Sequence, residues 1–290
     1  MNMTNFYQKF LTTTNNMDEP LQEYKFNAKD HIHTYLDKPL MGTSTVVGVI
    51  SKPLTYWASG LAVGKLGWTN SKLNEGEKYI NIPLDKRISH AEPFLEQIKG
   101  MTTPQYLDLL DEAYKAHATK LDDSAKSGTD MHAIMEEYVK NCVIQNKGIP
   151  TAHNPNEDKK LSDFIDWSLL NVKRFLWSEL YCYSNTLWVG GISDCGVELN
   201  DGKVGIIDFK SSKESYDSQF IQCAGYDLQI SENGGFTDNG YPVFSLEKEI
   251  EFYAIIPFGA DKFTVDFRYN TGELKDGFKS CLTLHKLLNK

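Results

Sequence analysis

The spacing of apolar residues changes near residue 177, and this change restricts the fold more than any other feature of the sequence. Residues 158–176 place apolar side chains at the roughly 3.6-residue interval of an amphipathic helix. Strand-like apolar runs follow at 177–184, 187–199, 203–212, 249–258 and 263–269. Helices are predicted at 217–231, with Asp217 as N-cap, and over the C-terminal residues. This order predicts an α/β fold in which helices flank a mixed β-sheet.

The chain before residue 156 has a weaker pattern. Residues 1–22 are polar and rich in Asn and Thr, which predicts a loose tail. Residues 23–36 suit a β-hairpin, 42–51 form a β-branched run typical of a strand, and 54–68 resemble a helix containing glycines. Further helices are predicted to begin near Thr103 and Thr129. We therefore expect a tail (1–22), a mostly helical part with a small hairpin (23–155) and an α/β core (156–290).

Bulk composition indicates a soluble globular protein. Apolar residues make up 41% of the chain and charged residues 24%, close to ordinary usage. No stretch approaches the roughly 18 apolar residues of a spanning helix, and the first residues lack the apolar segment of a signal peptide. A cytoplasmic location without membrane contact is expected. The five cysteines are scattered without a C-x-x-C pair, which predicts reduced thiols rather than disulfides or a standard zinc site.

The stretch "GIIDFKSSK" (205–213) places an acid and a base in an otherwise apolar strand. Strand side chains alternate, so Asp208 and Lys210 share a face while Phe209 points to the other. If Asn200-Asp201-Gly202 form a three-residue hairpin loop, Leu199 faces Lys203 and Asp194 lies opposite Asp208. A two-residue Asp-Gly turn would instead send Asp194 to the other face.

Two aspartates directly opposite one another repel unless a cation lies between them. Mg²⁺ or Mn²⁺ suits such oxygen ligands and often completes its shell with substrate phosphate. Lys210 beside the ion would position an attacking water or offset transition-state charge. The arrangement is typical of metal-assisted phosphodiester hydrolysis, and the alternative is a plain surface salt bridge between Asp208 and Lys210.

Four motifs occur in a fixed order around these residues. The sequence contains Gly191-Ile192-Ser193-Asp194, then Asp208-Phe209-Lys210, then Gln222-Cys223-Ala224-Gly225-Tyr226. Upstream, Gly128, Thr129, His132 and Glu136 have the spacing G-T-x-x-H-x-x-x-E. In these motifs, and in residues 43–58, the chain resembles the PD-(D/E)XK nuclease superfamily, specifically its RecB-like exonuclease branch from phages, bacteria and mitochondria. The resemblance covers about residues 40–230 and implies a restriction-endonuclease-like core over 156–290.

The resemblance assigns roles to individual residues. Asp194, Asp208 and Lys210 would be catalytic, and the two aspartates would bind Mg²⁺ or Mn²⁺ with the backbone carbonyl of Phe209. His132 would be a further metal ligand, and Glu179 matches an acidic position that binds metal directly or through water; the alternative for Glu179 is an exposed strand glutamate. The remaining expected roles are substrate binding by Gln222, Tyr226, Ser211 and Lys213, with support from Glu136 and Thr129.

The sequence departs from the family pattern in three places. Ser193 replaces the proline of the superfamily name, and the acid before Lys210 is Asp208 rather than glutamate. Some relatives carry an iron–sulfur cluster, but this chain lacks their C-terminal cysteine group, so no cluster is expected. Tyr56 and Trp57 suit either base stacking or a core, and His31 with His33 would form a metal pair only with a third ligand that the sequence does not show.

These features predict a metal-dependent DNA exonuclease of recombination, repair or processing. The formal net charge of −9 argues for a small DNA footprint or a partner such as a recombinase, a single-strand-binding protein or a helicase. The alternatives are an RNA-directed nuclease, a catalytically silent nucleic-acid-binding subunit of the same fold, and an unrelated α/β protein that binds a small acidic or metal-bridged ligand.

Overall fold

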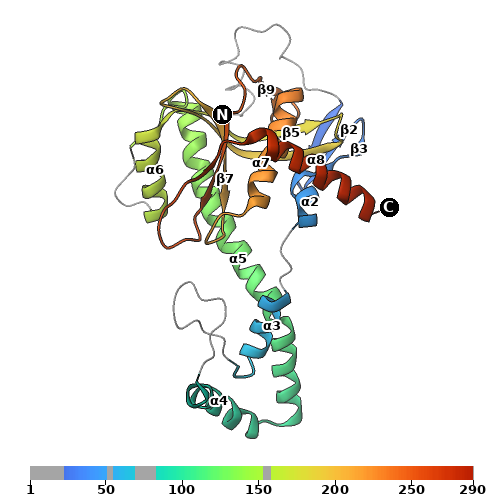
Figure 1. Cartoon of the computed structure of the whole chain (residues 1–290), viewed down its shortest axis with the longest axis vertical. Helices are drawn as coiled ribbons and strands as arrows, with labels where there is room; N and C mark the ends of the chain where they lie inside the picture. Colours follow the sequence, from blue (N-terminus) through green and yellow to red (C-terminus); the bar gives the residue numbers. More distant parts are fainter. Residues whose placement is uncertain (1–22, 51–54, 69–82, 153–157, 290) are drawn as a thin grey trace. The chain divides into compact units, whose positions relative to one another are not determined.

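A computed structural model describes residues 23–50, 55–68, 83–152 and 158–289 (Figure 1). The chain divides into two compact units, residues 1–51 with 128–290, and residues 52–127. This division differs from the predicted boundary at residue 155. The reason is that the N-terminal hairpin and the helix carrying His132 pack against the α/β core, through Tyr24 on Tyr183 and through Met135 in the cluster around Ile207. The predicted tail lies outside the described residues.

A mixed sheet forms the centre of the first unit. Its strand order is β11-β10-β7-β6-β5-β8-β9, and β4 pairs in parallel with β6. The five predicted strands are confirmed as β5 (Val172–Ser184), β6 (Val189–Leu199), β7 (Val204–Lys210), β10 (Phe252–Pro257) and β11 (Asp266–Arg268). The predicted helix 158–176 is wrong over its last five residues, which belong to β5. The short strands β4 (Met41–Gly42), β8 (Gly235–Phe236) and β9 (Pro242–Phe244) were not predicted.

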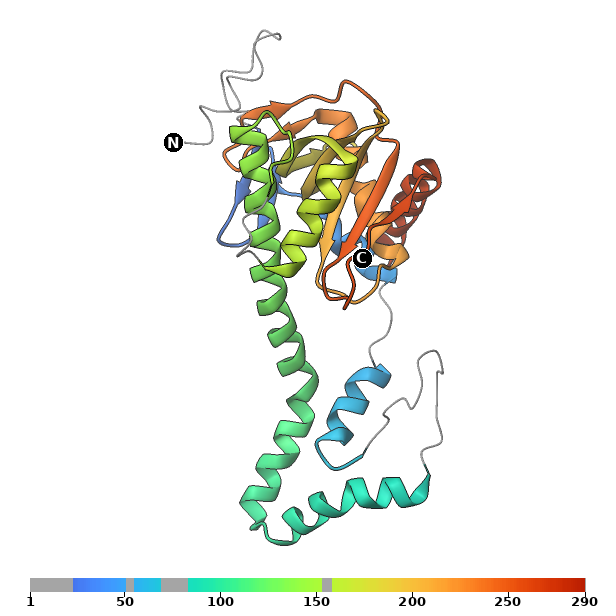
Figure 2. The ribbon, with the colours of Figure 1, turned by 90° about the vertical axis from the view of Figure 1, so that its left-hand side faces the viewer.

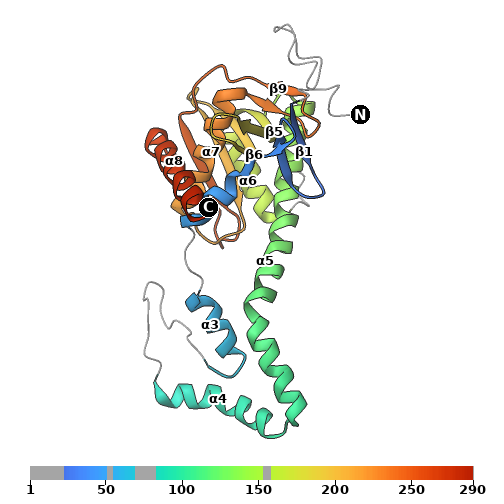
Figure 3. The ribbon, with the colours of Figure 1, turned by 90° about the vertical axis from the view of Figure 1, so that its right-hand side faces the viewer.

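Helices cover both faces of this sheet, as the α/β prediction requires. The last part of α5 (Thr103–Gln145) and α6 (Lys159–Asn171) pack on one face, where Met135 and Phe164 meet Ile207 (Figure 2). On the other face lie α2 (Thr43–Val47), α7 (Asp217–Asn233) and α8 (Thr271–Leu288), and Phe220 and Phe278 meet Ile206 there (Figure 3). Parallel β7 and β10 are joined through α7, the crossover connection that parallel strands need.

A small antiparallel sheet precedes the core. It contains β1 (Tyr24–Asn27), β2 (Ile32–Tyr35) and β3 (Lys38–Pro39), which confirms the predicted hairpin. Tyr24 stacks on Tyr183 of β5 with ring centroids 4.7 Å apart. The aromatic contact therefore joins the hairpin to the main sheet.

Three further local predictions were wrong. Within the β-branched run 42–51, Thr43–Val47 form α2 and Gly48–Ile50 a 3₁₀ turn, because burial of Val46 among α7 and α8 outweighs β-propensity. The helices expected near Thr103 and Thr129 are one helix, α5, since Gly128 costs only about 1 kcal/mol inside a helix. Tyr216, not Asp217, is the N-cap of α7.

The second unit contains α3 (Thr55–Gly64), α4 (Leu84–Lys99) and the first part of α5. In α4 a proline, Pro93, lies inside the helix. Among the helices of the described ranges, none is both long and apolar enough to cross a membrane.

Candidate functional site

The β6–β7 hairpin has the register predicted from its loop. The backbone N–H of Leu199 donates to the carbonyl of Lys203 at 2.9 Å, and Gly202, with φ 89°, closes the three-residue loop. The pairing continues to Cys195 opposite Ile207. The next position in this register places Asp194 opposite Asp208, so the alternative two-residue turn is wrong.

A third acid, Glu179, lies beside Asp194 and Asp208, and these three residues are called the acidic row below. On β5, Ser178 pairs with Cys195 and Leu180 with Ser193, so the residue between them, Glu179, lies opposite Asp194. Glu179 has φ 48°, a left-handed conformation that non-glycine residues rarely adopt inside a strand. Such backbone costs about 1–3 kcal/mol and is concentrated at functional sites. Three neighbouring strands therefore present Glu179, Asp194 and Asp208 side by side.

Asp208 is a buried carboxylate with an incomplete set of partners. Its exposed fraction is 1%, and within the described ranges neither of its oxygens receives a hydrogen bond of normal geometry. The Lys210 ammonium forms an ion pair with Oδ2 at 2.5 Å. Burial, with the nearby Asp194 charge, raises the pKa of Asp208 to about 7 although Lys210 opposes the shift. The pKa of Lys210 is raised because both aspartates outweigh the effect of burial, so its ammonium persists at neutral pH.

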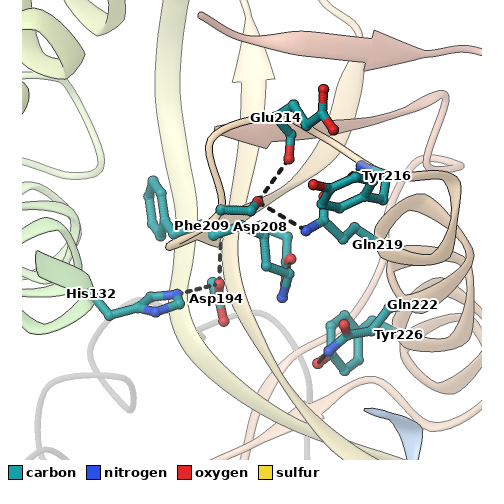
Figure 4. Close-up of polar contacts among 11 residues, drawn as sticks. His132, Asp194, Asp208, Phe209, Glu214, Tyr216, Gln219, Gln222 and Tyr226 are labelled. Carbon is teal, nitrogen blue, oxygen red and sulfur yellow. Dashed lines mark hydrogen bonds and ion pairs between the residues drawn. The ribbon is translucent and has the colours of Figure 1, made fainter. Parts of the chain in front are cut away.

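Asp194 is in hydrogen-bond contact with helix α5 and with the neighbouring strand β7. Its Oδ2 lies 3.0 Å from Nε2 of His132 on α5 and 2.9 Å from the backbone N–H of Phe209 on β7 (Figure 4). Burial alone would raise the pKa of Asp194, but His132, Lys210 and the Phe209 N–H outweigh it and lower that pKa. Burial lowers and Asp194 raises the pKa of His132, and the net shift is upward. The site therefore holds Asp194 ionised.

Glu136 lies one helical turn after His132 on α5 and meets the acidic row. Burial and a hydrogen bond with the Glu179 carboxyl raise the pKa of Glu136 to about 8. Two carboxyl groups share such a hydrogen bond only when one of them is protonated. At neutral pH Glu136 is therefore a protonated partner of Glu179.

Helix α7 brings the predicted substrate-binding pair to the site. Nε2 of Gln222 donates to the Tyr226 hydroxyl at 2.6 Å, and both side chains lie on the side of α7 that faces the acids (Figure 4). Tyr226 packs over Gly191, where an added Cβ would lie 2.7 Å from its ring. The first glycine of the G-x-x-D motif is thus needed for the close approach of α7 to β6.

A cavity of about 660 Å³ joins these elements. The predicted site residues on its wall are His132, Glu136, Glu179, Asp194, Phe209, Gln222 and Tyr226. Asp208 and Lys210 are on the adjoining strand and do not line it. Ser211 and Lys213 are exposed in the segment that follows β7, also outside the lining. The side chains of Thr129, Tyr56 and Trp57 lie outside the described residues.

The sequence analysis gave no role in this site to Thr43, and it discounted His31 and His33, yet all three line the cavity. Thr43 of α2 donates to the Gly190 carbonyl at 3.0 Å and receives Nε2 of Gln229 at 2.7 Å, which joins α2, β6 and α7. His31 and His33 also line the cavity, but His31 lies in the turn before β2 rather than on a strand face. The consecutive glycines Gly190 and Gly191 were the available signal, because glycine inside a strand marks close approach of other groups.

The carboxylates of Asp194 and Asp208 are oxygen donors of the type that hard divalent cations bind. In the described part of the chain, no group of three or more His, Cys, Asp or Glu side chains already converges at metal-binding geometry. The observation that favours a cation is the buried Asp208 carboxylate, whose polar partner among the described residues is the Lys210 ammonium on Oδ2, beside the ionised Asp194. Carboxylate oxygens are the ligands that Mg²⁺ and Mn²⁺ prefer.

Comparison with known proteins adds no family assignment. No protein-family model and no curated protein matches the sequence. What the chain does must therefore be argued from its motifs and from the geometry of the acidic row.

Proposed function

We propose that this chain is a metal-dependent deoxyribonuclease that hydrolyses phosphodiester bonds from DNA ends, with a restriction-endonuclease-like core. The observation that carries the proposal is the row of Glu179, Asp194 and Asp208 on three adjacent strands, with Lys210 paired to Asp208. A surface salt bridge would be exposed, whereas Asp208 is 1% exposed and its burial has an energetic cost that a bound cation would remove.

Asp194, Asp208, His132 and the Phe209 carbonyl would hold the cation, with Glu179 at the end of the row. Bound Mg²⁺ or Mn²⁺ would supply charge neutralisation at the phosphate and activation of water. Lys210, protonated beside Asp208, would orient the attacking water and stabilise the charge that develops on the phosphoryl oxygens. The His132 contact to Oδ2 and the Phe209 N–H would keep Asp194 ionised and in place.

The phosphodiester would lie between the acids and α7. Gln222 and Tyr226 are hydrogen bonded to each other on the cavity wall, and both can donate to phosphate oxygens. Hydrolysis adds water across the P–O bond: the oxygen of water bonds to phosphorus, and the leaving oxygen takes up a proton. A cavity of about 660 Å³ is the size of a small-molecule pocket, which favours a strand end over an internal duplex site.

The test is digestion of linear single-stranded, linear double-stranded and circular DNA, with Mg²⁺, with Mn²⁺ and with EDTA. The wild type should shorten only linear DNA and only with metal. Lys210→Ala should lose at least about 100-fold of the rate, the usual effect of removing a group that stabilises transition-state charge. Lys203→Ala is the matched control, because this lysine pairs with Asp201 in the hairpin loop and should change nothing.

Each other outcome has a distinct meaning. Linear DNA that survives both metals but is bound by the protein would contradict catalysis and favour a silent binding subunit. Cleavage of a matching RNA strand alone would contradict the assignment of DNA as substrate. Cleavage that persists in Lys210→Ala would show that another residue performs the chemistry.

A further inference from the structure

The β1–β2 hairpin forms one side of the cavity that contains the acidic row. His31, Ile32 and His33, called the hairpin wall below, all line this cavity (Figure 3 shows the hairpin beside the sheet). Ile32 is 41% exposed, His31 is exposed, and His33 is 5% exposed. None of these residues takes part in the chemistry proposed above.

His33 packs directly against Gly190 of strand β6 in the main sheet. A Cβ added at Gly190 would lie 2.7 Å from the Cβ of His33 and 2.9 Å from its Cγ, closer than real side-chain carbons approach. Only glycine at position 190 therefore admits the imidazole next to β6. Glycine inside a strand lowers stability, so this position is adapted to the histidine. The neighbouring Gly191 admits Tyr226 and Thr43 in the same way.

The tautomer of His33 follows from its hydrogen bond. The hydroxyl of Tyr24 lies 2.7 Å from Nδ1 of His33, and Tyr24 is only 1% exposed. A buried hydroxyl proton needs an acceptor, and Nδ1 is the one in contact with it among the described residues. Tyr24 therefore donates to Nδ1, and the hydrogen of the neutral ring is on Nε2. Burial, with the charge of His31, lowers the pKa of His33 to about 4, so the ring stays neutral at physiological pH.

The chemistry of the hairpin wall suits a base rather than a phosphate. The hairpin wall, His31, Ile32 and His33, contributes no Lys or Arg to the cavity, whereas the acids and α7 that would hold the phosphodiester lie on other parts of its lining. Phe26 supports the wall from behind, with ring centroids 5.3 Å from His31 and 4.7 Å from His33, and Tyr181 lies 4.9 Å from Phe26. Imidazole rings and apolar side chains packed on aromatic rings are typical surfaces for unpaired bases.

We infer that the hairpin wall binds the unpaired base next to the phosphodiester that is cut, with His33 Nε2–H donating to the edge of the base and with His31 and Ile32 against its face. This inference rests on the proposed function, since it gives the nuclease site its substrate class, a single-stranded end. His33 is then a substrate-contacting residue, and Tyr24 is a positioning residue that fixes its tautomer.

The experiment measures binding without cleavage. Affinities are determined in EDTA for a single-stranded oligonucleotide and for the same strand with abasic nucleotides at its end. The wild type should prefer the strand with bases. His33→Phe keeps a ring over Gly190 but loses the donor, so it should weaken binding of the normal strand by about fivefold, the effect of one ordinary hydrogen bond. Its binding of the abasic strand should change by less than about twofold.

Two further variants complete the design. His31→Asn keeps a residue that tolerates φ 55° while removing the ring, and it should also reduce the preference for bases. His285→Phe is the matched control: this half-buried histidine of α8 is outside the cavity lining and should leave both affinities unchanged.

The inference is overturned if the wild type binds normal and abasic ends equally, or if His33→Phe and His31→Asn weaken both strands alike. These results are separate from those for the proposed function. Cleavage of linear DNA without a base preference would leave the nuclease assignment intact and remove the base site. A base preference without cleavage in any metal would support the base site and contradict the nuclease assignment.

Discussion

Substitution of Gly191 by alanine tests how the motifs are held together. The new Cβ would lie 2.6 Å from Oγ1 of Thr43 and 2.7 Å from Cε1 of Tyr226. Both side chains are buried, with exposed fractions of 1% and 5%, so neither can move into solvent without repacking. Thr43 is also fixed by its bonds to the Gly190 carbonyl and to Gln229.

The expected cost follows from these contacts. Overpacking of a core costs about 1–3 kcal/mol, and weakening the two hydrogen bonds of Thr43 adds about 1 kcal/mol each. Alanine also reduces the backbone freedom of the unfolded chain, which stabilises the folded protein by up to about 1 kcal/mol and offsets part of this cost. Gly191→Ala should therefore lower the free energy of unfolding by about 2–4 kcal/mol, and the melting temperature by roughly 5–10 °C.

Urea denaturation followed by circular dichroism measures this difference. Gly272→Ala in the first turn of α8 is the control, because its Cβ would meet nothing within 4 Å and it should be neutral or slightly stabilising. The double variant Gly191→Ala with Thr43→Ala should lose less than the sum of the single changes, since the closest contact is gone. A Gly191→Ala protein as stable as the wild type would refute the close approach of α2 and α7 to β6.

Two further predictions concern the pH dependence of stability that arises from the carboxyl groups of Glu136 and Glu198. The folded pKa of Glu136, about 8, is above its ordinary 4.5, so its contribution to stability is present below pH 4.5 and lost as the pH rises through 8. In EDTA, the melting temperature of Glu136→Gln should rise relative to the wild type between pH 6 and 9, whereas Glu137→Gln, on the exposed side of the same helix, should follow the wild type; an equal pH response of all three would contradict the carboxyl pair. Glu198 is 2% exposed and is bound by Lys173 at 3.0 Å, Arg174 at 2.7 Å and Lys248 at 3.3 Å. Burial would raise its pKa, but these three cations lower it to about 2, so its stabilisation is present above pH 4.5 and lost as the pH falls through 2. Because the three cations are about half exposed to solvent, which screens them, Glu198→Gln should lose about 1–2 kcal/mol at pH 7 in urea denaturation and approach the wild type under acid; a constant difference at all pH values would indicate a packing effect instead.

Local sequence was sufficient for the β6–β7 part of the candidate site. Strand alternation placed Asp208 and Lys210 on one face, and turn chemistry at Gly202 left two hairpin loops, of which the structure has the three-residue one that aligns Asp194 with Asp208. Both depend on residues close in the chain, where steric rules leave few alternatives. The same holds for the existence of the five main strands and of α6, although the boundary between α6 and β5 lies at residue 171 and not at the predicted 176.

Local rules failed where distant packing decided the conformation. Within the β-branched run 42–51, Thr43–Val47 became helix α2 because Val46 is buried among α7 and α8. Position 179 is in a strand yet has φ 48°, which no pattern of residues indicates. The continuity of α5 through Gly128 could not be predicted either, since one glycine is a small penalty in a long helix.

The sequence by itself determined the five main strands of the sheet and the shared face of Asp208 and Lys210, because these depend on alternation within a few residues. It narrowed the pairing of Asp194 to two turn-dependent registers, of which the structure has the one opposite Asp208. Only the tertiary structure placed Glu136 on Glu179, Thr43 on Gly191 and His33 on Gly190. These pairs are separated by about 40 to more than 150 residues in the chain. Their contacts depend on how the helices and the hairpin pack on the sheet. That packing is decided by burial of the whole core, so no short stretch of sequence can predict it.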